Sequence, residues 1–137
     1  MFAREYRYFL PCDLHVPVRI NGTDEWVQWD FGKPRQVSSA AVYWFDDRPP
    51  ADGKGAGGCR VPASWEVLYL PPGGKADDPK DWKPVKPVKP AAGPRAYGVE
   101  RDKYNEAQFA AVETTAVRLR VKLQKGFSGG ILEWKMK

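Results

Sequence analysis

The chain carries two groups of aromatic and charged side chains at the ends of a long loop rich in glycine and proline. The first group reads Trp44-Phe45-Asp46-Asp47-Arg48, and the second begins at Cys59-Arg60. A third segment, Gly126–Gly130, places Phe127 and Ser128 among glycines. A loop of this length in a compact domain is usually either functional or disordered. Aromatic and charged residues at both of its ends favour a function.

These residue types suit a sugar site. Aromatic rings offer a flat apolar face to the C–H side of a sugar ring, and carboxylates and guanidinium groups offer fixed partners to its hydroxyls. If successive strands are antiparallel, these loops share one end of the fold. We therefore identify as candidate ligand contacts the residues Trp44, Asp46, Asp47, Arg48, Arg60, Phe127 and Ser128.

Two of these assignments have a structural alternative. By strand alternation, Trp44 can be a core residue as readily as a stacking platform, whereas Phe127, in a glycine-rich loop, is harder to bury. An ion pair between Arg60 and Asp46 or Asp47 would pin the long loop, and a bidentate pair would also fix the geometry for recognition. From the sequence, both interpretations stay open.

Catalytic groups are hard to assemble from this chain. Asp46 and Asp47 are adjacent, so in a strand they point to opposite faces and cannot flank a bond as a glycosidase pair does. His15 is the single histidine and leaves no Ser/His/Asp set. The glycines of residues 53–58 lie between strands, whereas a phosphate-binding loop precedes a helix. We expect a protein that is not an enzyme.

Composition indicates one globular domain. The chain has 137 residues, 42% of them hydrophobic and 13% aromatic, which is enough for a core. A net charge of +5 would permit nucleic-acid binding, but the lysines concentrate among prolines in Lys75–Lys89, as in a solvated loop. The alternating cations Arg118, Arg120 and Lys122 lack interleaved aromatic residues, so we expect a solvated face and no nucleic-acid partner.

Neither a membrane partner nor a disulfide framework is expected. Every apolar run is shorter than a membrane span, and the first residues make a poor signal peptide. The chain is expected to be cytoplasmic, or extracellular or periplasmic if it is cut from a secreted enzyme. Cys12 and Cys59 allow at most one disulfide, and we expect free thiols.

Short strands account for most of the chain. The clearest is Val117–Leu123, where strict alternation predicts four apolar residues inside and three cations outside. We expect an all-β fold, an antiparallel β-sandwich of the jelly-roll type, over residues 23–137, with residues 1–22 packed on it. The expected strands are Glu25–Phe31, Ser38–Phe45 returning antiparallel after a turn at Gly32–Pro34, Trp65–Leu70, a short edge strand in Asp81–Val85, Asn105–Val112, Val117–Leu123 and Ile131–Met136.

The order of several sequence motifs in this chain resembles the order found in a known family. EWVQWDFGKPRQVSSAAVYWFDD, RVPASWEVLYL and TTAVRLRVKLQKGFSGGILEWKMK resemble the discoidin-like (coagulation factor type C) domains of the galactose-binding-domain-like fold. VYWFDD, GGCRVPASW and GFSGGILEW look more narrowly like a domain appended to bacterial β-L-arabinofuranosidase-like glycoside hydrolases. The resemblance covers Asp24 to Lys137, and residues 1–22 depart from the family's pattern.

The resemblance implies a non-catalytic carbohydrate-binding module, lectin-like and accessory to a neighbouring glycoside hydrolase domain, for a plant or microbial glycan. The alternative is a structural domain that packs on its parent enzyme and has no ligand of its own. Relatives often hold calcium through a glutamate in the last strand, which implies Glu133 here, with Asp24 as a companion. We expect no required cofactor, and at most a structural calcium ion.

Overall fold

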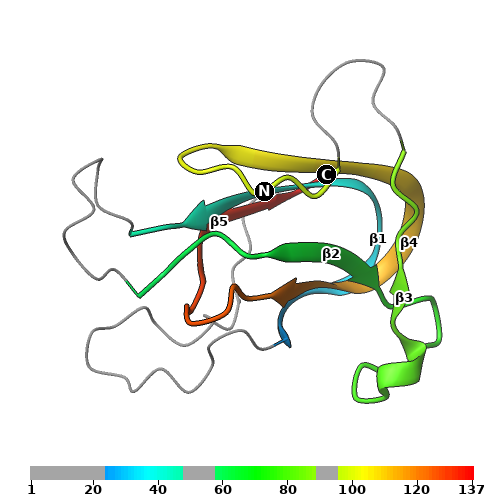
Figure 1. Cartoon of the computed structure of the whole chain (residues 1–137). Helices are drawn as coiled ribbons and strands as arrows, with labels where there is room; N and C mark the ends of the chain where they lie inside the picture. The colour runs from blue at the N-terminus through cyan, green and yellow to red at the C-terminus, as the bar shows by residue number, and fades with distance from the viewer. Residues whose placement is uncertain (1–23, 48–57, 89–95) are drawn as a thin grey trace.

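The computed structural model describes residues 24–47, 58–88 and 96–137, and in this part of the chain it is almost entirely antiparallel β-sheet (Figure 1). The strands form one hydrogen-bonded sheet in the order β3-β2-β4-β1-β5. The elements are β1 (Asp24–Phe45), β2 (Ser64–Tyr69), the 3-10 helix η1 (Pro79–Asp81), β3 (Lys83–Pro84), β4 (Tyr104–Lys122) and β5 (Gly130–Met136).

The two longest strands, β1 and β4, bend together and fold the sheet into two layers. Their pairing register shifts between Asp30 and Arg35, where Gly32 has a φ of 76°, a value that suits glycine. Figure 1 shows both strands curving on the right, the side on which β3 lies. The first layer holds the start of β1, the end of β4, and β2 with β3. The second holds the end of β1, the start of β4, and β5. The fold is therefore the expected all-β sandwich.

One expectation about connectivity is wrong. The segments Glu25–Phe31 and Ser38–Phe45 do not form a hairpin with each other, because both belong to β1 and both pair with β4. Gly32-Lys33-Pro34 bends the strand from one layer into the other without reversing it within the sheet. Likewise, the segments Asn105–Val112 and Val117–Leu123 are not two separate strands, because β4 runs from Tyr104 to Lys122 through the corner.

The core lies between the layers, and two tryptophan pairs cross it. Trp29 in β1 meets Trp134 in β5 edge to face at 5.6 Å between ring centroids, and Trp44 meets Trp65 of β2 in the same way at 5.5 Å. Such pairs add about 0.5–1.5 kcal/mol beyond their buried area. The predicted alternation of β4 is confirmed, since the apolar residues of the Val117–Leu123 segment are all buried.

A buried hydroxyl holds the corner of β4. Thr114 is 1% exposed, and its Oγ1 accepts hydrogen bonds from the backbone N–H groups of Leu70 (3.2 Å) and Ala116 (3.1 Å). The same oxygen lies at donating distance from the carbonyl oxygens of Leu70 (2.8 Å) and Ala116 (2.6 Å). Thr114 thus ties the end of β2 to the bend.

Two further expectations can be compared with the structure. The Asp81–Val85 segment supplies only the short edge strand β3, as expected from Pro84. The expectation of free thiols is wrong, because Cys59 is disulfide-bonded. The other cysteine in the sequence, Cys12, lies outside the described residues, as does the whole of residues 1–22.

No helix in the described ranges is long and apolar enough to cross a membrane.

We expect Thr114→Val to lower the free energy of unfolding by about 1–3 kcal/mol, since the isosteric change removes the hydrogen bonds that the hydroxyl makes with buried backbone groups. Urea denaturation measures this loss. Thr115→Val, at the partly exposed neighbour, is the matched control. Equal stability of the two variants would show that the corner hydroxyl is not important.

Candidate functional site

The structure brings the ends of the long loop together with the Gly126–Gly130 loop. Arg60 N–H donates to the Ser128 carbonyl (3.1 Å), and Ser128 N–H donates to the Gly58 carbonyl (2.8 Å). Cys59 and Ser128 form an isolated parallel bridge. We call this group the loop-end cluster and define it by Asp46, Asp47, Cys59, Arg60, Phe127 and Ser128.

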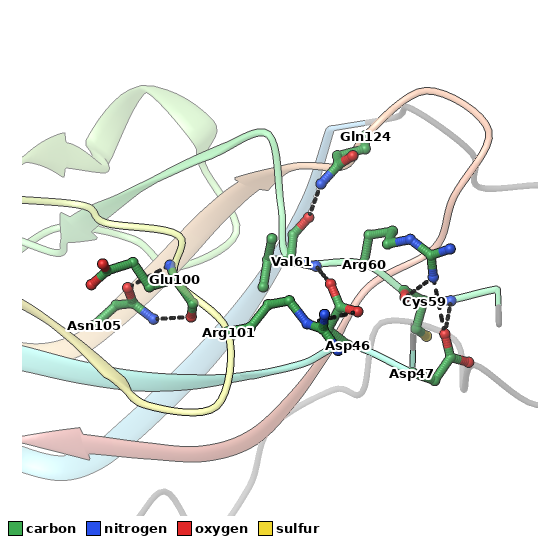
Figure 2. Close-up of polar contacts among 9 residues, drawn as sticks. All are labelled: Asp46, Asp47, Cys59, Arg60, Val61, Glu100, Arg101, Asn105 and Gln124. Atoms are coloured by element: carbon green, nitrogen blue, oxygen red, sulfur yellow. Dashed lines mark hydrogen bonds and ion pairs between the residues drawn. The ribbon is translucent and has the colours of Figure 1, made fainter. Parts of the chain in front are cut away.

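Three candidate contacts lie in the interior. Trp44 is 2% exposed and packs on Trp65, so the structure places it in the core and no ligand can stack on it. The Asp46 side chain is 1% exposed, accepts the Val61 N–H (3.1 Å) and pairs with Arg101 Nε (3.3 Å), as Figure 2 shows. Ser128 is also buried. These side chains support the loop and do not face solvent.

The turn that presents Arg101 is itself fixed. Buried Asn105 accepts the Glu100 N–H through Oδ1 (2.8 Å) and donates through Nδ2 to the Glu100 carbonyl (3.0 Å) (Figure 2). This closes the turn before β4 and aims Arg101 at Asp46. A residue far along the chain therefore holds the end of β1 against the start of β2.

Asp47, Arg60 and Phe127 form a stack at the surface of the cluster. Asp47 Oδ1 accepts hydrogen bonds from the Cys59 N–H (3.0 Å) and from Arg60 Nη1 (3.3 Å). The Arg60 guanidinium carbon lies 4.3 Å from the Phe127 ring centroid. The ion pair that would pin the loop is thus present, with side chains 13% (Arg60) and 23% (Asp47) exposed. Arg48 lies outside the described residues.

The two candidate calcium ligands are not brought together. Asp24 pairs with Lys122 in the first layer, and Glu133 pairs with Tyr43 in the second. Directly paired residues share a face of the sheet, and Asp24 and Glu133 lie on the outward faces of opposite layers. Across the described ranges, no group of three His, Cys, Asp or Glu side chains could hold a metal ion.

An open cavity of about 660 Å³ lies where β1 and β2 begin and β4 ends. We call it the strand-end cavity. Arg120 and Glu66 face each other across paired strands and form an ion pair in its wall. Its lining combines carboxylates, cations, a hydroxyl and aromatic rings: Asp24, Ser64, Trp65, Glu66, Tyr97, Arg120 and Lys122.

Tyr97 is the most constrained residue of this cavity. It has a φ of 64°, its ring meets Trp65 edge to face at 4.9 Å, and its hydroxyl accepts the Val67 N–H at 3.3 Å. Burial raises the pKa of Tyr97 above its ordinary value; the Val67 hydrogen bond lowers the pKa, and the Glu66 carboxylate raises it. The phenol therefore stays neutral to higher pH in the folded protein than in a free tyrosine, and its O–H can donate a hydrogen bond.

Sequence reasoning missed this cavity. Glu66, Arg120 and Lys122 read as the outward residues of alternating strands, which is correct but does not show that they face one another. Tyr97 stands in a Pro/Ala/Lys-rich segment with no strand signal. The outward Glu66 of one strand and the outward cations of another were the available clues.

The chain matches no protein-family model and no curated protein, but it resembles solved structures. One is a chain from the β-galactosidase of Streptococcus pneumoniae (TM-score 0.62, 19% identity, covering 90% of this chain and 75% of that one). Chitosan-binding module 1 of a Paenibacillus sp. IK-5 chitosanase/glucanase gives a TM-score of 0.56 at 13% identity, covering 85% of this chain and 71% of that one. Chitosan-binding module 2 of the same enzyme, solved with chitotriose, gives 0.53 at 14% identity, covering 87% and 81%. At these identities the similarity shows a fold shared with these structures.

We expect Tyr97→Phe to change how stability depends on alkaline pH. Because the pKa of Tyr97 is raised by folding, its contribution is fully present below the unfolded pKa of about 10 and is lost as pH rises through the folded value. Denaturant titrations at rising pH should show a steeper loss for wild type than for the variant. Tyr43→Phe, a hydroxyl deletion in the other layer, is the control. Parallel curves for wild type and Tyr97→Phe would contradict the assignment.

Proposed function

We propose that this protein is a non-catalytic carbohydrate-binding module whose ligand enters the strand-end cavity. The observation that carries the proposal is the cavity itself, which combines aromatic rings with polar groups in a fold shared with carbohydrate-binding modules. From the order of its sequence motifs, we propose more specifically that the chain is a discoidin-like accessory domain of a bacterial glycoside hydrolase.

The polar groups of the cavity suit hydroxyls better than a charged ligand. Glu66 and Arg120 pair with each other, so together they offer acceptors and donors with little net charge. Ser64 and Tyr97 add hydroxyl groups that can both donate and accept. A sugar presents several hydroxyls at fixed angles and is recognised by such an arrangement.

The loop-end cluster is proposed as a second set of contacts. Phe127 and Arg60 present a ring and a guanidinium held in one geometry, and Asp47 shares that network. Arg48 belongs to the same proposal from its place in the sequence. The disulfide of Cys59 is typical of oxidising compartments and supports a secreted parent protein.

A packing domain without a ligand should expose a contiguous apolar patch on a sheet face. In the described ranges, the exposed large apolar side chains are Trp26 in β1, Val88 after β3 and Leu132 in β5, which lie on separate elements. This scatter favours carbohydrate binding over the structural alternative.

We expect wild-type protein to bind members of a glycan array that includes chitotriose, and calorimetry to show weaker binding by Glu66→Gln. Loss of one hydrogen bond to a charged group costs about 1.5–3 kcal/mol, or roughly ten- to a hundredfold in Kd. The fold should persist, because the exposed pair with Arg120 contributes little stability.

Phe127→Ala and Arg60→Ala test the loop-end contacts, and unchanged melting temperatures control for folding. Loss of binding only in these two variants would move the site from the cavity to the loop-end cluster. A well-folded wild-type protein that binds no glycan would overturn the proposal and leave the structural alternative.

A further inference from the structure

The outer face of the first layer carries a stack of one guanidinium between two indoles. The Arg118 guanidinium carbon lies 3.9 Å from the Trp26 ring centroid and 4.0 Å from that of Trp82. Arg118 Nε donates to Gln28 Oε1 (2.8 Å), and Nη2 donates to the Ala76 carbonyl (3.0 Å). Trp82 Nε1 donates to the same carbonyl (3.0 Å). The stack is therefore fixed by hydrogen bonds as well as by ring contacts.

The two indoles differ in exposure. Trp82 is buried beside Leu70 and Ala116, where the segment before β3 covers one end of the outer face. Trp26 is 39% exposed. With the Arg118 cation held on its ring, Trp26 is an aromatic surface in a fixed orientation, partly exposed on the outer face of β1 beside β4.

Trp26 is continuous with the strand-end cavity. It pairs directly with Arg120, whose side chain pairs with Glu66, and both of these residues line the cavity. From Lys122 at the cavity to Arg120, which pairs with Trp26, β4 advances about 7 Å at ~3.3 Å per residue. A ligand that occupies the cavity and also stacks on Trp26 must cover both places, which takes more than one sugar ring.

The charges of this face favour an uncharged chain. Along β1, β2 and β4 the outward cations Arg118, Arg120 and Lys122 are matched by as many outward carboxylates, namely Asp24, Asp30 and Glu66. Arg118 is enclosed by aromatic rings and Arg120 is paired with Glu66. A polyanion would be repelled by these carboxylates, and a polycation would be repelled by the cations. The balance suits hydroxyl groups.

We propose that the outer face of the first layer, with Trp26 as its stacking platform, extends the strand-end cavity into a binding surface for a linear, uncharged oligosaccharide chain. The inference rests on the proposed carbohydrate-binding function and adds a chain-length requirement. Trp26 stacks on the C–H face of one sugar ring. Glu66 and Arg120 form hydrogen bonds both with this ring and with the ring in the cavity.

The test is calorimetry with ladders of uncharged cello-, xylo- and N-acetylated chito-oligosaccharides, each from the monosaccharide to the hexasaccharide. Affinity of wild type should rise with chain length. Trp26→Ala should bind the monosaccharide as wild type does and lose about three- to tenfold in affinity for the hexasaccharide. Trp26→Phe, which keeps a ring, should retain most of the gain. Leu132→Ala, which removes exposed apolar surface from the other layer, should behave as wild type.

Nuclear magnetic resonance of the wild type provides a second readout that needs no variant. The Trp26 indole N–H signal should shift with the hexasaccharide and not with the monosaccharide. An unchanged length dependence in Trp26→Ala, or an unmoved Trp26 signal, would overturn the sheet-face surface and leave the cavity proposal intact. Binding of none of these ladders by wild type would overturn this inference, and binding of other glycans on the array would show that the proposed function survives it.

Discussion

The passage of β1 and β4 through both layers is the constraint on which the rest of the structure depends. Because each strand contributes to both halves of the sandwich, the paired strands β1 and β4 join the two layers at the corner. The Trp29–Trp134 and Trp44–Trp65 contacts then close the space between the layers. Once the corner forms, the ends of both strands return to one side of the molecule, where the loops lie.

That arrangement determines what the loop-end residues can do. Asp46 is bound on one side by Arg101 and on the other by the Val61 backbone, so it works as a buried tie between segments distant in sequence. Arg60 is held by Asp47 and by the Cys59 carbonyl. A site built on such residues is rigid, and rigidity lowers the entropy lost when a ligand binds.

The basic residues of β4 illustrate how neighbouring strands change the meaning of a pattern. Arg118, Arg120 and Lys122 form a cationic row along one strand. Across the sheet, Trp26 and Trp82 enclose the first and Glu66 pairs with the second. Together with the outward carboxylates of β1, these contacts convert a basic stripe into a balanced surface with an exposed indole. The aromatic residues that the stripe lacks within its own strand come from other elements.

The sequence by itself determined the all-β class, the burial of alternate residues in Val117–Leu123 and the edge position of Pro84, because each follows from backbone geometry within a few residues. Only the tertiary structure decided that Gly32–Pro34 is a corner and not a hairpin, since both continuations satisfy the same local preferences. It also decided that Trp44 is core, that Asp24 and Glu133 lie on opposite layers, and that Trp26, Arg118 and Trp82 meet. These outcomes depend on which strands become neighbours, and long-range pairing leaves no periodic signal in a single chain.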